Sequence, residues 1–153
     1  MQKNAKYITI GLGIIGAGLI IRKLYKMINE EKLSSNFDWS EFDSKDGAKM
    51  TPEVKANIKE LAKNLEVIRS AVGTPLIINS GYRSPAHNKA VGGRSASFHM
   101  TGQASDFYSK TVPTKKIHAI IENLIQSGKI KQGGLGLYPT WIHYDIRGTK
   151  ARW

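Results

Sequence analysis

The chain contains no cysteine among its 153 residues. A disulfide-stabilised scaffold is therefore excluded, and so is a metal site built from thiolates. Any metal that this protein binds must be held by histidine and carboxylate side chains. Hydrophobic residues make up 41% of the chain, as in ordinary globular proteins, and the length suits one domain with a substantial core.

Acidic residues are scarce, because 12 Asp and Glu stand against 23 Lys and Arg, which gives a formal net charge of +11. Such an excess favours anionic surroundings: nucleic acid, anionic lipid headgroups or an anionic cell-wall polymer. A nucleic-acid-binding domain is one functional hypothesis, but it rests on charge alone. The basic residues are spread along the chain and no nucleic-acid-binding motif accompanies them, so we expect no nucleic-acid partner.

Charge is absent altogether from residues 7–21, and basic residues flank this run on both sides. As a helix this run spans about 22 Å, short of the roughly 30 Å hydrocarbon core, whereas residues 7–25 approach the lower limit for spanning. A cleaved secretory signal is the rival interpretation, but no small-residue cleavage site follows. We therefore predict that residues 1–26 hold an N-terminal apolar helix, a membrane anchor or uncleaved signal that contacts the membrane through residues 7–25.

The remaining chain divides into a polar linker, residues 27–36, and a single α+β domain, residues 37–153. Regular apolar spacing predicts a helix from Pro52 to about Ala71 and a second helix that begins after Pro113. Each of these segments is followed by a glycine, which commonly ends a helix.

Short apolar runs predict strands at residues 76–79 and 104–108. Residues 134–138 and 141–147 predict an antiparallel hairpin around a Pro-Thr turn. We expect a small, mainly antiparallel sheet that packs against the helices and carries the functional site on its open face.

Two possible metal ligands lie in one short segment. His99 and Asp106 are seven positions apart, and Gly102 between them lets the backbone turn. A catalytic zinc commonly has three protein ligands, drawn from His nitrogen and carboxylate oxygen, and one open position. The best third ligand is His143, which alternates with Asp145 on a predicted strand, so that both side chains face one side. Iron or manganese would also suit such a triad.

Residues 97–106 read Ser-x-His-x-x-Gly-x-Ala-x-Asp, and His-x-Asp follows at residues 143–145. With Ser-Gly-Tyr-Arg-Ser at residues 80–84, these motifs resemble the zinc D-Ala-D-Ala carboxypeptidase family of peptidoglycan peptidases. The resemblance extends over roughly residues 37–153. It implies a hedgehog/DD-peptidase-like fold and a bound Zn²⁺ in the site described above.

The resemblance also implies roles for Arg83 and Ser97 in substrate binding. Arg83 would grip a carboxylate or carbonyl of the peptide, because a guanidinium forks onto carboxylates better than an ammonium group does. Many relatives place a Glu or His three residues before the third ligand as general acid/base, but this chain has Thr140 there. Asp145 is then our predicted general base, and the alternative is that it orients His143.

The favoured hypothesis is a zinc-dependent peptidoglycan peptidase. It would hydrolyse D-amino-acid-containing stem or cross-link peptides, as a carboxypeptidase or endopeptidase, in wall remodelling or phage-type lysis. The alternative is a non-catalytic, metal-stabilised module that binds wall peptide or a protein partner. The complete ligand set favours the peptidase, and Thr140 favours the module. The expected substrate places the domain outside the cytoplasm, membrane-anchored on the periplasmic or cell-wall side. A phage-encoded and a bacterial protein are equally compatible with these features.

Overall fold

The computed structural model describes residues 18–21 and 32–153. Residues 18–21 are helical, and Leu33–Trp153 form a compact unit of their own. None of the helices within residues 18–21 and 32–153 combines the length and the hydropathy that a membrane span requires. Most of the predicted anchor at residues 7–25 lies outside the described residues, so anchoring remains a prediction.

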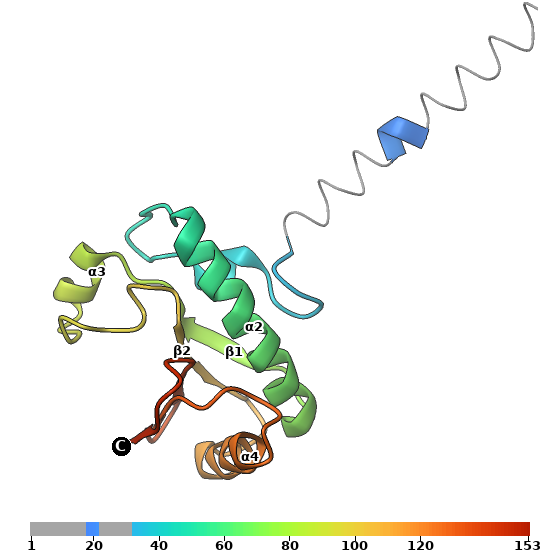
Figure 1. The fold of residues 1–153 in the computed structure, drawn as a ribbon, viewed down its shortest axis with the longest axis vertical. Coiled ribbons are helices and arrows are strands. Elements are labelled where there is room, and N and C mark those ends of the chain that lie inside the picture. Colours follow the sequence, from blue (N-terminus) through green and yellow to red (C-terminus); the bar gives the residue numbers. More distant parts are fainter. Residues whose placement is uncertain (1–17, 22–31) are drawn as a thin grey trace, which may run out of the picture. The chain divides into compact units, whose positions relative to one another are not determined.

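Four helical elements belong to the compact unit (Figure 1). They are η1 (Trp39–Phe42), α2 (Pro52–Val72), α3 (Pro85–Ala90) and α4 (Thr114–Gln126). The start of α2 is capped as its sequence predicts, because the Thr51 hydroxyl accepts a hydrogen bond from the Val54 N–H at 3.2 Å. Gly73 ends this helix in the left-handed conformation, with φ of 77°. Both predicted long helices are therefore confirmed.

Five strands form one sheet: β1 (Ile77–Ser80), β2 (Ala104–Tyr108), β3 (Gly134–Leu137), β4 (Ile142–Asp145) and β5 (Ala151–Arg152). Their order across the sheet is β1-β2-β4-β3-β5, and the predicted hairpin is the antiparallel pair β3 and β4. The sheet is mixed rather than only antiparallel, because β5 pairs in parallel with β3. This arrangement follows from the turn at Gly148, which has φ of 87° and sends the chain back antiparallel to β4.

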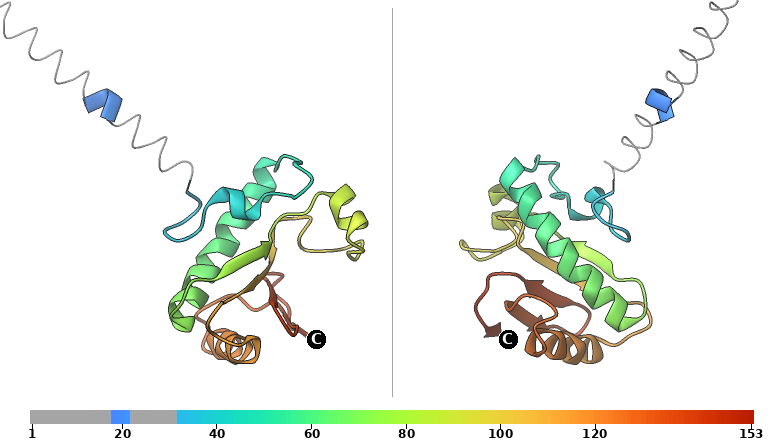
Figure 2. Two further views of the ribbon diagram at one scale, coloured as in Figure 1. Left: turned by 180° about the vertical axis from the view of Figure 1, so that it is seen from behind. Right: turned by 45° about the vertical axis from the view of Figure 1, so that its right-hand side comes forward.

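One face of the sheet is covered by α2 and α4, which contact each other (Figure 2). The core between them is made by alternate strand residues, including Phe107, Ile142 and Tyr144, each with 0% of its surface exposed. Residues between these positions point to the opposite face of the sheet. The open face expected for the functional site is thus available on β2 and β4.

The N-terminal part of the compact unit contributes to the core more than its polar sequence indicates. Phe37 and Phe42 are 2% and 0% exposed and meet edge to face, with ring centroids 6.0 Å apart. Ser34 and Asn36 both donate hydrogen bonds to the Glu66 carboxylate on α2. The compact unit therefore begins at Leu33, within the segment predicted as linker.

Candidate metal centre

The pairing register of β2 and β4 brings two of the predicted ligands together. Asp106 lies directly opposite His143, and Ala104 lies opposite Asp145. Because the neighbouring residues Ser105 and Tyr144 face the helices, all four of these side chains project from the open face of the sheet. Residues 37 positions apart in sequence thereby become neighbours.

The third ligand, His99, comes from the loop that precedes β2. Gly102 turns this loop with φ of 73°, and a Cβ there would lie 2.8 Å from the Val54 carbonyl oxygen on α2. Glycine is required on both grounds. The loop is also tied to the end of β1, because the Arg83 N–H donates to the His99 carbonyl at 3.1 Å. The side chain of His99 is consequently buried, with only 3% of it exposed.

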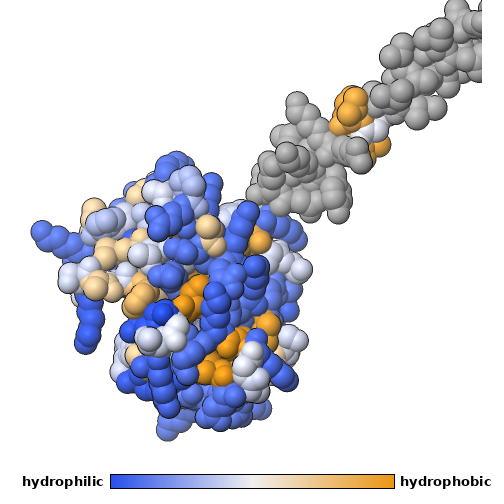
Figure 3. Space-filling view, viewed as in Figure 1, coloured by the Kyte–Doolittle hydropathy of each residue, from blue (hydrophilic) through white to orange (hydrophobic). Residues whose placement is uncertain are grey.

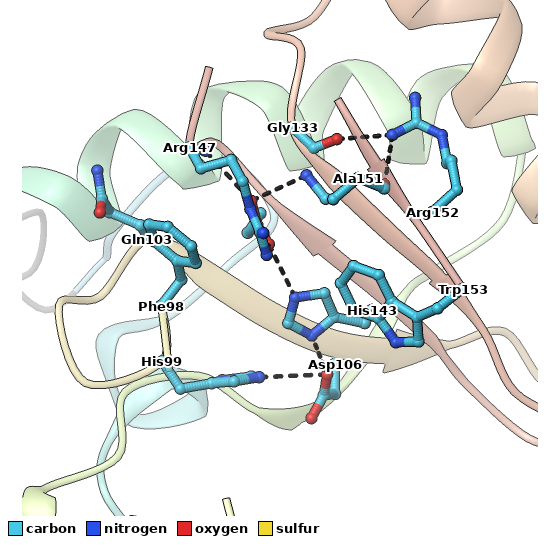
Figure 4. Close-up of polar contacts among 12 residues, drawn as sticks. Phe98, His99, Gln103, Asp106, Gly133, His143, Arg147, Ala151, Arg152 and Trp153 are labelled. Carbon is cyan, nitrogen blue, oxygen red and sulfur yellow. Dashed lines mark hydrogen bonds and ion pairs between the residues drawn. The ribbon is translucent and has the colours of Figure 1, made fainter. Parts of the chain in front are cut away.

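Asp106 lies between the two imidazole rings (Figure 4). Its Oδ1 atom is 3.3 Å from His99 Nε2 and 2.8 Å from His143 Nδ1. One potential ligand atom from each residue can be chosen so that all three lie within 4.8 Å of one another. Two ligands of a tetrahedral zinc at ~2.1 Å lie roughly 3.4 Å apart, so these separations fit a single shared ion after small adjustments.

The second nitrogen of each ring is already engaged, and this determines which nitrogen faces a metal. His99 Nδ1 lies 2.7 Å from the Gly81 carbonyl oxygen, which can only accept, so Nδ1 carries the proton. His143 Nε2 lies 3.1 Å from Oδ2 of Asp145, a carboxylate that likewise accepts. The lone pairs of His99 Nε2 and His143 Nδ1 are left for the ion, as in metal sites whose histidines are oriented by outer acceptors.

Asp145 is completely buried, with 0% of its surface exposed. Both of its oxygens are bound by the Arg147 guanidinium, Nε to Oδ1 at 2.8 Å and Nη2 to Oδ2 at 2.5 Å. The N–H of Gly134 donates to Oδ1 at 2.9 Å. A Cβ at Gly134 would lie 2.3 Å from Oδ2, so glycine is needed for this close approach. These contacts favour orientation of His143 as the role of Asp145; its assignment as the general base stays a prediction.

The charges of the site are strongly coupled. Burial raises the pKa of Asp106, but the interactions of its carboxylate with His143 and His99 outweigh burial and hold that pKa well below its ordinary value. Burial lowers the pKa of His143, while hydrogen bonds to Asp106 and Asp145 raise it to a net value above the ordinary one. Without metal, the two carboxylates on either side of His143 therefore favour its protonated form.

Arg83 lies at the outer oxygen of Asp106. Its Nη2 atom donates to Oδ2 of Asp106 at 2.5 Å, and its Nε donates to the Ser80 hydroxyl at 2.8 Å. Since Oδ1 faces the imidazoles, this ion pair orients the Asp106 carboxylate. No described residue accepts a hydrogen bond from Nη1 of Arg83, which leaves one edge of the guanidinium for another ligand.

Neither Ser97 nor Thr140 forms a hydrogen bond with His99, Asp106 or His143 in the described part of the chain. Ser97 is half-buried two residues before His99, and among the described residues its hydroxyl has no hydrogen-bond partner. Thr140 is exposed in the turn between β3 and β4. The predicted role of Ser97 in substrate binding is thus compatible with its position but is not tested by it.

Sequence reasoning missed three contributors: the Gly81 carbonyl, Arg147 and Trp153. A backbone carbonyl leaves no residue-type signal, so its bond to His99 could not be foreseen. Arg147 stands two positions after Asp145, a spacing that could have suggested the ion pair. The Trp153 ring contacts His143 because Trp153 directly follows β5. This strand has only two residues, and its sequence gives little sign of a strand.

The domain is thus of the α+β class, and its sheet carries on the open face a group of two histidines and one carboxylate that could hold a metal ion. Residues 34–145 match the model of the family described as Peptidase M15. The chain belongs to the Peptidase M15 family, as the sequence motifs indicated.

A curated relative is similar over part of its length. The zinc D-Ala-D-Ala carboxypeptidase of Streptomyces albus G is 32% identical over 100 residues, which make up 61% of this chain and 39% of that protein. The matched region therefore spans about two fifths of that relative.

Proposed function

We propose that this protein is a zinc-dependent peptidase that hydrolyses D-alanyl peptide bonds in peptidoglycan stem or cross-link peptides. The observation that carries the proposal is the triad of His99, Asp106 and His143, whose facing atoms suit one shared metal ion. Family membership and the name of the similar Streptomyces protein support the peptidase class and zinc.

The donor set itself fits zinc, because two imidazole nitrogens and one carboxylate oxygen are ligands of catalytic zinc sites. Zinc held by three protein ligands would polarise the scissile carbonyl and lower the pKa of a bound water. His99 and His143 would bind through Nε2 and Nδ1, since Gly81 and Asp145 hold the other ring nitrogens.

The protein side chains around the triad supply orientation and charge. Arg83 fixes the outer oxygen of Asp106, and its Nη1, from which no described residue accepts a hydrogen bond, would grip a substrate carboxylate or carbonyl. Asp145 orients His143 and keeps the correct ring nitrogen protonated. Ser97, two residues before His99 in the sequence, would contribute its hydroxyl to binding of the peptide.

A second candidate function is a non-catalytic module that uses the same metal for stability and binds wall peptide or a protein partner. Two observations favour it: Thr140 occupies the position of the usual acid/base, and Asp145 is buried and paired with Arg147. The two functions differ in catalysis: the peptidase cleaves wall peptide, whereas the module only binds it.

The location of the substrate suggests where the protein acts. We propose that residues 7–25 hold the protein in a membrane with the domain on the periplasmic or cell-wall side. The surface in Figure 3 is largely hydrophilic, and the net charge of +11 suits an anionic wall polymer. Wall remodelling and phage-type lysis are both served by such an arrangement.

The test is digestion of peptidoglycan by the full chain loaded with zinc, with released fragments identified by mass spectrometry. Chelator and the His143→Ala variant serve as controls. Release of free D-alanine indicates a carboxypeptidase, and opened cross-links indicate an endopeptidase. Metal-dependent binding of wall peptide without any fragment would contradict the peptidase and support the module.

A further inference from the structure

Trp153 reaches the metal centre from the opposite edge of the sheet. It follows β5, and its carbonyl accepts a hydrogen bond from the Leu137 N–H at 2.9 Å. Its own N–H points to the Leu135 carbonyl at 3.4 Å. These contacts continue the pairing of β5 with β3 and fix the backbone from which the indole projects.

The indole crosses β3 at Gly136, the residue that lies opposite His143 in the register. A Cβ at Gly136 would lie 2.6 Å from Nε1 and 2.7 Å from Cε2 of Trp153. Any larger residue would collide with the indole, so Gly136 provides the space through which Trp153 meets the ligand. The rings of Trp153 and His143 have centroids 5.1 Å apart and are tilted by 46° (Figure 4).

Two further contacts hold the indole in place. Its Nε1 donates to the Tyr138 hydroxyl at 2.8 Å, and the guanidinium carbon of Arg147 lies 5.7 Å from the ring centroid. Arg147 in turn lies over the Phe98 ring at 4.3 Å. The indole is thus fixed on several sides, yet Trp153 remains 49% exposed. A positioned aromatic surface of this kind, in contact with a metal ligand, is available to a molecule bound at the ion.

We propose that Trp153 is a specificity-determining residue, whose exposed indole surface binds the small aliphatic side chain flanking the scissile peptide bond. This inference rests on the proposed function. Successive Cα atoms of a peptide are ~3.8 Å apart, so a residue next to a carbonyl at the ion can reach a ring in contact with His143. An indole face offers apolar contact and no hydrogen-bond donor for a carboxylate, so a methyl group gains by burial there.

The expected preference is for an alanyl over a glycyl residue. The two differ by one methyl group, and on a half-exposed surface this predicts a ratio of kcat/KM between about 3 and 10. The experiment measures this ratio on acyl-D-alanyl-D-alanine and on the peptides in which each D-alanyl residue is replaced in turn by glycyl. The zinc-loaded full chain is compared with Trp153→Ala and Trp153→Phe.

In Trp153→Ala the alanyl preference at one of the two positions should fall to about 1 with zinc content unchanged. Trp153→Phe keeps an aromatic face and should retain most of the preference. Trp39→Ala is the matched control, because that indole contacts Lys55 and Lys59 on α2 instead of a metal ligand. It should leave the ratio at the wild-type value. An equal loss on all peptides, together with weaker zinc binding, would overturn the proposal and leave Trp153 as a support of His143.

A binding measurement separates this inference from the proposed function. The indole N–H signal of Trp153, identified by its absence in Trp153→Phe, is followed by nuclear magnetic resonance as peptide is added. If no peptide is cleaved, the peptidase function fails, and a shift of this signal with tighter binding of the alanyl peptide still supports the indole surface. Equal binding of alanyl and glycyl peptides, or no shift at saturation, overturns it.

Discussion

The Nε2 atom of His143 lies 3.1 Å from Oδ2 of Asp145, on the side of the ring opposite the nitrogen that faces Asp106. A strand places residues i and i+2 on one face, which is why His143 and Asp145 meet. Because Asp145 is on the far side of the imidazole and bound by Arg147, it is better placed to orient the ligand than to take a proton from a metal-bound water.

We predict that Asp145→Asn weakens zinc binding by about 10- to 100-fold, the scale seen when an outer partner of a metal ligand is lost. The amide keeps the shape but loses the charge that holds the proton on Nε2 and pairs with Arg147. Chelator competition measures the affinity. Asp46→Asn is the control, because that carboxylate accepts from the Ser84 hydroxyl and forms no possible metal site with the other residues that the structure describes. Unchanged zinc affinity with kcat lowered by about 10²–10⁴ would instead identify Asp145 as the general base.

Each of His99→Ala, Asp106→Ala and His143→Ala should lose most of the bound zinc, because a three-ligand site does not hold its ion well on two. Elemental analysis of the purified full chain gives the stoichiometry. His118→Ala on α4 is the control and should keep about one zinc per chain. Undiminished zinc in all three variants would remove this centre as the metal site.

Arg83→Lys should raise KM for wall peptides while zinc stays bound. A lysine keeps a positive charge near Asp106 but loses the planar fork that can hold a substrate carboxylate. Steady-state kinetics with zinc analysis on the same samples gives both quantities, and Arg69→Lys on α2 serves as the control. If zinc is lost in step with activity, Arg83 acts only by orienting Asp106.

The sequence predicted the elements of the site better than it predicted their contacts. Gly102, the strand at residues 104–108 and the hairpin carry local signals, and each is found where it was expected. The pairing of β2 with β4, which sets Asp106 against His143, depends on long-range register that no local pattern specifies. For the same reason β5 and its parallel pairing were not foreseen.

The burial of Phe37 and Phe42 shows a different limit. Both residues lie in the segment predicted as the domain, residues 37–153, but their polar surroundings in the sequence do not predict such deep burial. Their burial depends on the space between η1 and the end of β1, where a Cβ at Gly81 would lie 2.6 Å from the Phe42 Cα. The space that these side chains occupy is formed by other parts of the folded domain. It therefore cannot be predicted from the local sequence around Phe37 and Phe42.

We predict that the full chain sediments with membranes and is released by detergent but not by high salt. The apolar run at residues 7–25 would insert, whereas attraction of a basic protein to anionic lipid would be screened by salt. A variant lacking these residues is the control and should remain in the supernatant. Recovery of a mature protein that begins near residue 27 would show that the segment is a cleaved signal.

Zinc affinity should fall as the pH is lowered from about 8 to 5, because zinc must displace the proton that metal-free His143 holds between Asp106 and Asp145. The pKa of His143 is raised in the folded protein, so its charged form stabilises the metal-free fold at low pH. That stabilisation disappears as the pH rises through the raised pKa of His143. The deprotonated ring nitrogen is then available to bind zinc.

Chelator competition across this pH range, with proton release on zinc addition, measures the linkage. The Asp145→Asn variant removes one of the two carboxylates that raise the pKa of His143, so its pH profile should move to lower pH. An affinity independent of pH, or a profile that Asp145→Asn leaves in place, would contradict the arrangement of His143 as a cation between two carboxylates. Opposite changes are thus expected from one substitution: weaker zinc binding near neutral pH, and less competition from protons at acid pH.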